Sequence, residues 1–333
     1  NLTGKYKNLY YNSKPVWSPG GDMLAYIAYV DGHEEIMAIS AKDGKIFSRI
    51  TADLYGKEYD SIREKGSGLA WSSDGDKIAF VGVKEGKDLL LTVNVVTGEL
   101  TRKIEMPFDA AYSPAWSPDS KRVCLIGLKD GRADIYTFRL EDGLLTQITS
   151  DPYDDNSPSW HPSGSRIVYS SERDGEYKIF LIDLDTMQSR QITHGSQNDI
   201  QPSWMPDGLK VAFCSDMNGI YDIYTVKSDG QELTRLTNIL TGCFDPAFSS
   251  GGIVGIHGPS MLALTIYNKG RNDIYVLNSK ELLNERVPLP KIDEQKPEYV
   301  IDDRGVRGVK YSFAFSPDII FVDMGYISGG SFQ

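Results

Sequence analysis

Carboxylate and amide side chains gather in three short segments of the chain, and each segment stands a few residues before an aromatic residue. The first holds Asp154, Asp155 and Asn156, the second holds Asn198 and Asp199, and the third holds Asp245 beside Phe244. Such segments can accept hydrogen bonds from a basic or amide-bearing ligand, and converging oxygen atoms are also what calcium requires. The alternative is that each side chain only bonds the turn in which it stands.

Residue patterns for covalent or metal-assisted catalysis are missing from the sequence. It contains no Gly-x-Ser-x-Gly string of a hydrolase, no Gly-rich phosphate loop and no His-Glu-x-x-His zinc motif. The four histidines, His33, His161, His194 and His257, do not stand at metal-ligand spacing from one another. The sequence therefore predicts that the protein is not an enzyme and has no catalytic residues, no bound metal and no cofactor.

The elements that position the acidic segments follow from an internal repeat. The tryptophans are Trp17, Trp71, Trp116, Trp160 and Trp204, and Phe248 takes the sixth place; they are 54 residues apart once and 44 or 45 thereafter. A glycine stands 15 residues after each tryptophan, usually behind Asp, Glu or Asn, which is the chemistry of a tight hairpin turn. A string such as Asp-Ile-Tyr follows, and several repeats close on a string such as Arg-Gln-Ile-Thr.

Each repeat predicts four short strands, because alternating apolar residues and turn signals recur at short intervals. Four strands in a repeat of about 40–45 residues are typical of a β-propeller blade. We therefore predict an all-β fold, a six-bladed β-propeller of four-stranded blades over residues 1–278, with a C-terminal extension. Because Leu2 and Thr3 resemble the closing string of the other repeats, they are expected to supply the outer strand of blade six. The alternative donor is residues 281–292.

The loops that join successive blades run toward the central channel, so the residues before each tryptophan are expected to form a ring at the channel mouth. The part of this ring built by blades four to six is acidic and amide-rich, with aromatic neighbours. Aromatic residues beside polar groups are typical of a protein-binding surface. The predicted partner-binding residues are Tyr11, Tyr112, Asp154, Asp155, Asn156, Asn198, Asp199, Phe244 and Asp245.

The repeated string Pro-x-Trp-Ser-Pro-Asp-Gly, followed by an apolar strand and Asp-Ile-Tyr, resembles the TolB-type propeller repeat. The resemblance covers residues 1–278, and the repeat is WD-like but lacks the Gly-His and Trp-Asp signatures of WD repeats. It implies a periplasmic or cell-envelope protein of bacteria that binds a protein through the channel mouth of its propeller.

Residues 279–333 differ in composition from the repeats. A charged, proline-containing segment predicts a linker over 279–303, and the alternating, aromatic-rich run that follows predicts an extension over 304–333. The extension is compatible with the start of a further β domain, such as an outer-membrane barrel. The alternatives are an unstructured or docked tail and a strand that completes the ring.

The net charge of the chain indicates which kind of partner the protein can bind. The chain of 333 residues carries 46 acidic and 35 basic residues, which give a net charge of −11. This charge favours a basic or polar protein or peptide segment and disfavours nucleic acid. No apolar run reaches the ~18 residues of a membrane helix, so no membrane span is predicted. We expect a monomeric, periplasmic, non-catalytic binding scaffold. The alternatives are a propeller enzyme, as a polysaccharide lyase or hydrolase, and the regulatory propeller of a larger protease.

Overall fold

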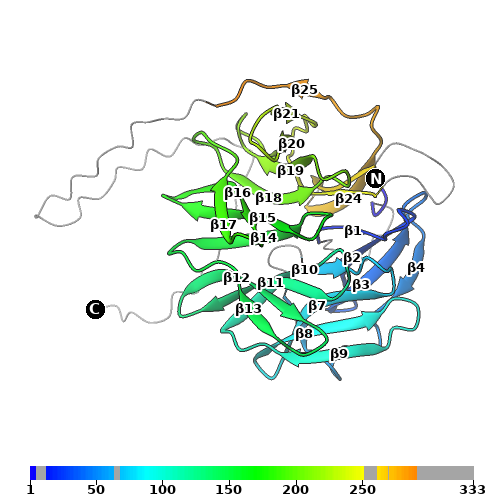
Figure 1. Ribbon diagram of the computed structural model, residues 1–333. Coiled ribbons are helices and arrows are strands. Elements are labelled where there is room, and N and C mark those ends of the chain that lie inside the picture. The colour runs from blue at the N-terminus through cyan, green and yellow to red at the C-terminus, as the bar shows by residue number, and fades with distance from the viewer. Residues whose placement is uncertain (5–12, 64–67, 251–260, 269, 291–333) are drawn as a thin grey trace, which may run out of the picture. The chain divides into compact units, whose positions relative to one another are not determined.

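The computed structural model describes residues 1–4, 13–63, 68–250, 261–268 and 270–290 of the chain. These residues contain strands and turns and no helix. The strands form six antiparallel sheets that radiate from a common centre, as Figure 1 shows for the unit Asn1–Ile292. The predicted all-β, six-bladed propeller is therefore confirmed.

The first three blades follow the chain in order from the centre outward. Blade one contains β1 (Val16–Trp17), β2 (Met23–Val30), β3 (His33–Ser40) and β4 (Ile46–Arg49). Blade two contains β5 (Ser61–Ile62), β6 (Leu69–Trp71), β7 (Lys77–Lys84), β8 (Lys87–Asn94) and β9 (Leu100–Glu105), with β5 and β6 both paired to β7. Blade three contains β10 (Ala110–Trp116), β11 (Arg122–Lys129), β12 (Arg132–Arg139) and β13 (Leu145–Gln147).

The last three blades differ at their outer edges. Blade four contains β14 (Asp154–Trp160), β15 (Arg166–Arg173), β16 (Glu176–Asp183) and β17 (Gln188–Gln191). Blade five contains β18 (Asp199–Trp204), β19 (Lys210–Ser215), β20 (Asp222–Lys227), β21 (Thr234–Arg235) and, outside them, β25 (Glu285–Arg286). Blade six contains only β22 (Cys243–Phe248), β23 (Leu262–Asn268) and β24 (Arg271–Leu277) among the described residues.

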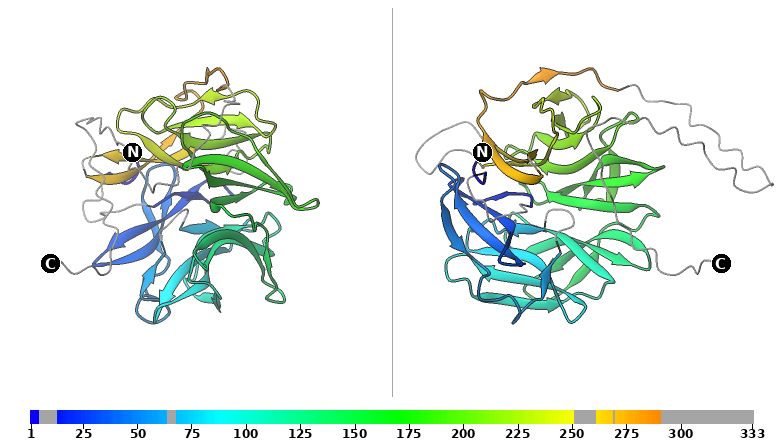
Figure 2. Two further views of the ribbon diagram at one scale, coloured as in Figure 1. Left: turned by 90° about the vertical axis from the view of Figure 1, so that its left-hand side faces the viewer. Right: turned by 180° about the vertical axis from the view of Figure 1, so that it is seen from behind.

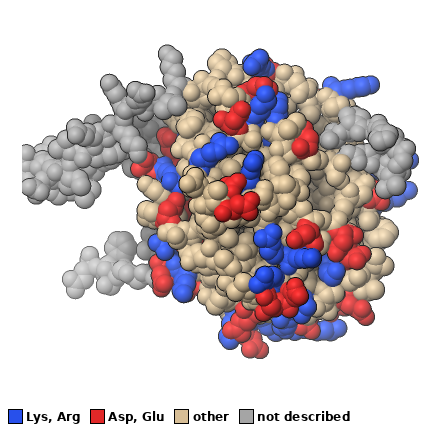
Figure 3. Space-filling model, in the orientation of Figure 1, with Lys and Arg blue, Asp and Glu red and all other residues tan. Residues whose placement is uncertain are grey.

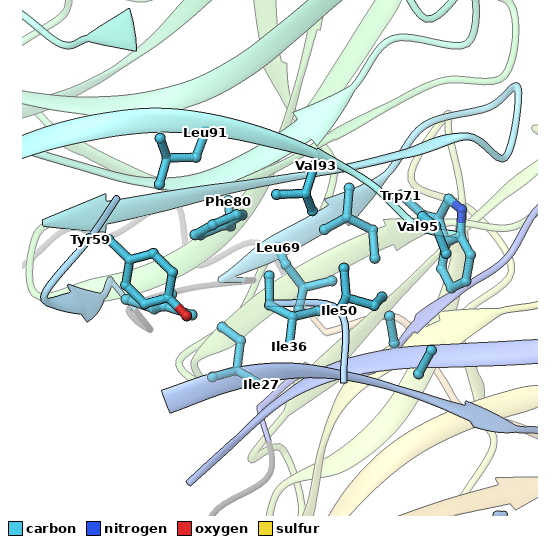
Figure 4. Close-up of a cluster of buried hydrophobic side chains, with 14 of the residues drawn as sticks. Ile27, Ile36, Ile50, Tyr59, Leu69, Trp71, Phe80, Leu91, Val93 and Val95 are labelled. Carbon is cyan, nitrogen blue, oxygen red and sulfur yellow. The ribbon is translucent and has the colours of Figure 1, made fainter. Parts of the chain in front are cut away.

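Apolar side chains on the two faces of each sheet form the core, which lies between neighbouring blades. Figure 4 shows the cluster between blades one and two, where Ile27 and Ile36 face Trp71 and Phe80. Two of the repeated tryptophans, Trp17 and Trp160, also join blades through their indole N–H groups. Trp160 Nε1 donates to the backbone oxygen of Ala115, one blade earlier, over 3.1 Å. The repeat therefore encodes packing between blades.

The closing string supplies a hydroxyl to the strand inside it. The backbone N–H of Ile135 donates to Thr149 Oγ1 over 2.8 Å, and Ile223 donates to Thr237 Oγ1 over 2.9 Å. The same bond joins Ile36 to Thr51 and Ile179 to Thr193. The threonine of the repeated string thus fixes the outer edge of the blade.

The N-terminus closes the ring by repeating this pattern on blade six. The backbone N–H of Leu2 donates to the oxygen of Ile274 over 2.8 Å, and Ile274 N–H donates to Thr3 Oγ1 over 2.9 Å. In both views of Figure 2 the N-terminus lies beside the strands of blade six. The expectation that Asn1, Leu2 and Thr3 supply this edge is confirmed.

Residues 281–292, the alternative donor, take a different place. Their strand β25 pairs with β21 of blade five, and Val287 N–H donates to the oxygen of Leu233 over 2.9 Å. We call residues 282–290 the edge segment. The predicted linker 279–303 therefore begins as a segment packed on blade five. Its remainder and the predicted extension 304–333 lie outside the described residues.

Candidate functional site

The innermost strands of four blades carry a bulge at the same repeat position. The register with the second strand shifts after Tyr112, Asn156, Ile200 and Phe244. The next residue, which precedes a repeated proline, has a positive φ of 51–59° in Ser113, Ser157, Gln201 and Asp245. Positive φ is uncommon outside glycine, and a bulge redirects a side chain away from the regular alternation of a strand. Recurrence in four blades makes this conformation part of the architecture.

We call the residues before the repeated prolines the pre-proline ring; they are Lys14, Ser113, Ser157, Gln201 and Asp245. Ser113 and Ser157 are buried, whereas Lys14, Gln201 and Asp245 are half-buried. Because these residues stand on or beside the innermost strands, the ring surrounds the propeller axis. Its partly exposed members come from blades one, five and six and carry an ammonium, an amide and a carboxylate.

Gln201 and Asp245 form a two-point contact between blades five and six. Gln201 Nε2 donates to Asp245 Oδ1 over 2.6 Å, and the backbone N–H of Asp245 donates to Gln201 Oε1 over 3.1 Å. Thr265 Oγ1 donates to the other carboxylate oxygen over 2.9 Å. Burial raises the pKa of Asp245, while the charge of Lys14 lowers it by less. Burial lowers the pKa of Lys14, and the negative charge of Asp245 raises it by less.

Two of the predicted acidic residues lie below the surface. Asp155 and Asp199 are both 0% exposed. Burial raises the pKa of Asp155 to about 7, although the nearby hydroxyls of Thr149 and Ser171 lower it. Burial raises the pKa of Asp199 to about 6 in the same way, beside Ser215 and Thr193. In this conformation neither carboxylate can touch a partner at the channel mouth, so their place in the structure is a junction between blades.

Their neighbours hold the hairpin of the preceding blade. Asp154 Oδ1 accepts the backbone N–H of Ala133 over 2.9 Å, and Asn198 Oδ1 accepts that of Tyr177 over 3.0 Å. The backbone oxygen of Asn156 accepts a bond from Ser170 Oγ over 3.2 Å. The side chains of Asp154 and Asn198 thus bond the preceding blade, whereas the alternative expected each side chain to bond only the turn in which it stands.

Two of the predicted aromatic residues, Tyr112 and Phe244, lie among the described residues. Tyr112 is 3% exposed in the core between blades three and four, where burial and the charges of Asp154 and Asp155 raise its pKa to about 12. Phe244 is half-buried beside Asp245, with its ring centre 5.2 Å from that of Tyr221. Tyr11 lies outside the described residues. Both residues directly precede a member of the pre-proline ring, but Phe244 keeps part of its surface exposed whereas Tyr112 is buried.

Sequence reasoning missed Lys14 and Gln201. A signal for them was present, because proline recurs two residues before the tryptophan or phenylalanine in five repeats while the residue before it changes. The residue before this recurring proline therefore marks a position at which the repeats differ in chemistry.

The histidines lie in different parts of the ring. His33 Nε2 contacts Glu35 Oε1 over 2.8 Å in blade one, and His161 Nε2 lies 3.2 Å from the oxygen of Gly208. His194 stands in the connection between blades four and five, and His257 is outside the described residues. In the part of the chain that the structure describes, no three His, Cys, Asp or Glu side chains are grouped as metal ligands. That part also contains no helix that is both long and apolar enough to cross a membrane.

Charged side chains of both signs are interspersed over the face shown in Figure 3. The net charge of −11 is therefore not gathered there into one acidic field.

Comparison with known proteins bears on the family. A family model described as the TolB beta propeller domain matches residues 64–180 and 158–254. These two matches overlap and together span more than half of the chain. Among curated proteins, no sequence matches this chain.

Solved structures share the fold at low sequence identity. TolB from Acinetobacter baumannii is 17% identical with a TM-score of 0.60, over 72% of this chain and 57% of that one. A putative TolB from Agrobacterium tumefaciens is 21% identical with a TM-score of 0.54, over 67% and 79%. An oligogalacturonate lyase in complex with manganese is 16% identical with a TM-score of 0.56, over 86% and 79%. The chain thus spans little more than half of the Acinetobacter protein, and at these identities the likeness shows the fold alone.

Proposed function

Because the chain belongs to the TolB β-propeller family, we propose that it is a non-catalytic scaffold of the bacterial cell envelope, located in the periplasm, that binds a protein or peptide segment. The proposed binding face is the end of the channel at which Lys14, Gln201, Phe244 and Asp245 stand. Propellers host both binding and catalysis, so the fold carries no weight in this choice.

The observation that carries the proposal is the uneven chemistry of the pre-proline ring. Gln201 and Asp245 are joined by two hydrogen bonds and are half-buried, so they present amide and carboxylate groups in a fixed geometry. Phe244 adds an apolar ring next to them. A fixed polar pair beside a partly exposed aromatic ring is suited to a polar peptide segment with one apolar side chain.

Photo-crosslinking in the native bacterium tests this face. We expect p-benzoylphenylalanine in place of Phe244 to give one discrete protein adduct. The matched control is the same substitution at Tyr267, which is 51% exposed on β23. Gln201→Ala in the Phe244-substituted chain should lower the adduct yield at least tenfold, because it removes both bonds to Asp245. Equal adducts from both positions, or a yield that Gln201→Ala leaves intact, would place the binding face elsewhere.

A further inference from the structure

A cavity of about 240 Å³ lies between blade three and blade four. Arg122 of β11 and Arg139 of β12 line it, together with Leu144, which precedes β13, and Met187 of blade four. Leu144 and Met187 are 50% and 49% exposed, so apolar surface is open to solvent here. Among the described residues, none that lines this cavity belongs to the pre-proline ring.

The two arginines face each other across neighbouring strands. Arg122 and Arg139 are paired residues in the antiparallel register of β11 and β12, so their side chains leave the sheet on the same face. Like charges directly opposite each other on a sheet are destabilising. A counter-charge is therefore expected beside this pair.

Two other blades show how the chain neutralises the same pair of positions. In blade four the paired residues are Arg166 and Asp183, with Nε and Oδ2 3.6 Å apart. In blade five they are Lys210 and Lys227, and each ammonium contacts one carboxylate oxygen of Glu232. In both blades a carboxylate thus serves the cation that begins the second strand.

Blade three keeps this cation and lacks the carboxylate. Arg139 stands at the repeat position of Asp183, and Leu144 stands at that of Glu232. The nearby Asp142 is taken by Arg139, which contacts its two oxygens through Nε and Nη2, each over 2.8 Å. No ion pair joins Arg122 to an acid among the residues that the structure describes.

The guanidinium of Arg122 is held in place by an aromatic ring. Its carbon lies 4.8 Å from the centre of the Trp160 ring, within the range of a cation–π contact. Asp119 is close enough to feel this charge: burial raises its pKa, and a hydrogen bond from Ser117 and the charge of Arg122 lower it. Its Oδ1 is occupied by Ser117 Oγ over 2.5 Å. The half-buried Arg122 makes no side-chain hydrogen bond to a described residue, so its N–H groups can serve a ligand.

We propose that this cavity binds a carboxylate that carries a small apolar group, with Arg122 donating to the carboxylate and Leu144 and Met187 contacting the apolar group. Guanidinium groups pair with carboxylates in a planar, two-point geometry. The charges of Arg122, Arg139 and Asp142 leave one positive charge, which suits a monoanion. The volume is below the about 300–1,000 Å³ typical of sites for drug-sized ligands, which suits a small one. This site goes beyond the proposed function at the pre-proline ring and does not depend on it.

The test uses 4-methylpentanoate as the probe in calorimetric titrations of the full chain at pH 7. We expect a dissociation constant on the order of 1 mM, as suits a ligand of this size. Neutral 4-methylpentanamide should bind at least tenfold more weakly, and Arg122→Gln should weaken probe binding at least tenfold. Arg166→Gln is the matched control, because it removes the same charge at the same repeat position where Asp183 already neutralises it, and it should leave binding unchanged.

Leu144→Glu gives a second test that keeps both arginines. The new carboxylate should neutralise Arg122 as Glu232 neutralises Lys210, so it should abolish probe binding and raise the melting temperature. Leu144→Gln has the same shape without the charge, and it should bind the probe at least tenfold more tightly than the Glu variant. Gln201→Ala should leave probe binding intact, which separates this site from the pre-proline ring. Probe binding that survives both Arg122→Gln and Leu144→Glu, or an absence of binding to the wild-type chain, would overturn the proposal.

Further ligands test the apolar group and separate the sources of the carboxylate. Acetate and inorganic phosphate lack an apolar group and should bind at least fivefold more weakly than the probe; tighter binding of phosphate would overturn the proposal. N-acetyl-L-leucine represents the C-terminal residue of a peptide. If it binds more tightly than 4-methylpentanoate, the site takes a peptide C-terminus, and if it binds less tightly, the site takes a small carboxylic acid. Both of these results retain the carboxylate site.

Discussion

Thr237 is the last residue of the repeated closing string of blade five, and its hydroxyl bonds both the backbone and a buried carboxylate of β20. Thr237 Oγ1 accepts the backbone N–H of Ile223 over 2.9 Å and donates to Asp222 Oδ1 over 2.8 Å. All three residues are buried. Removing the hydroxyl would leave a donor and an acceptor without this partner inside the protein, which costs more than the net contribution of one hydrogen bond.

We therefore expect Thr237→Ala to lower the free energy of unfolding by about 1–3 kcal/mol. Thr237→Ser should restore most of this loss because it keeps the hydroxyl. Urea denaturation at pH 7 measures both, with Thr186→Ala in an exposed turn as the control. Equal losses for the Ala and Ser variants would show that the methyl group, rather than the hydroxyl, stabilises the blade.

The buried carboxyl of Asp155 makes stability depend on pH. Its pKa is raised to about 7, whereas an aspartate in an unfolded chain has a pKa of about 3.9. Between these values the folded chain holds a proton that the unfolded chain releases, so the free energy of unfolding falls as the pH rises. Asp199, with a pKa raised to about 6, adds a similar fall at lower pH.

Asp155→Asn should remove this part of the pH dependence. The free energy of unfolding of the wild-type chain should fall between pH 4 and pH 7, by at most about 4 kcal/mol for Asp155. The variant should keep the fall below pH 6 that Asp199 causes and lose the fall between pH 6 and pH 7. Urea denaturation at pH 5, 6, 7 and 8 shows the difference, and parallel curves for the two proteins would contradict the raised pKa.

At the scale of elements, the edge segment covers the outer strand of blade five, which is shorter than the outer strands described for blades one to four. Strand β21 has two residues, and β25 pairs with both of them. Val287 N–H bonds Leu233, and its side chain packs against the core between blades four and five. A short strand at the edge of a sheet is weakly held, so a covering segment limits the opening of the blade.

Val287→Pro should detach the edge segment, because proline cannot donate to the oxygen of Leu233. We expect hydrogen exchange of the amides in residues 233–236 to accelerate at least tenfold, with little change in blades one to three. Val287→Ala keeps the N–H and should change exchange much less. Exchange that is equal in the two variants would mean that the side chain, rather than the strand pairing, holds the segment.

The sequence predicted the strands and blades better than the binding site, because the residues that form the blades recur in each repeat and those of the site do not. The tryptophan spacing and hairpin glycines recur because every blade needs them, so six copies made the fold readable. The depth of Asp155 and Asp199 depends on how neighbouring blades meet, and no local pattern records that contact. The bulge at Gln201 and Asp245 likewise depends on strand pairing, although the proline after each residue marks its position.

At the scale of the whole molecule, the propeller is held closed by joining its two ends. Leu2 packs against the core between blades six and one, and its oxygen would lie 2.5 Å from a Cβ atom placed on Gly44. The oxygen of Ile50 approaches Gly98 in the same way, one blade later. The N-terminal residues are therefore the closing string of blade six, supplied from the other end of the sequence.

Deleting residues 1–4 should open this junction. The N–H and oxygen of Ile274 would lose their partners, and part of the Leu2 side chain would leave the core, a loss of about 3 kcal/mol. The melting temperature should fall by roughly 5–10 °C. The exposed edge of β24 should also promote association, which light scattering detects.

Asn1→Ala keeps Leu2 and Thr3 and should have a much smaller effect, since closure depends on the backbone and hydroxyl contacts of those two residues. A deletion variant whose melting temperature and light scattering equal those of the wild-type chain would show that the ring is stable without this string.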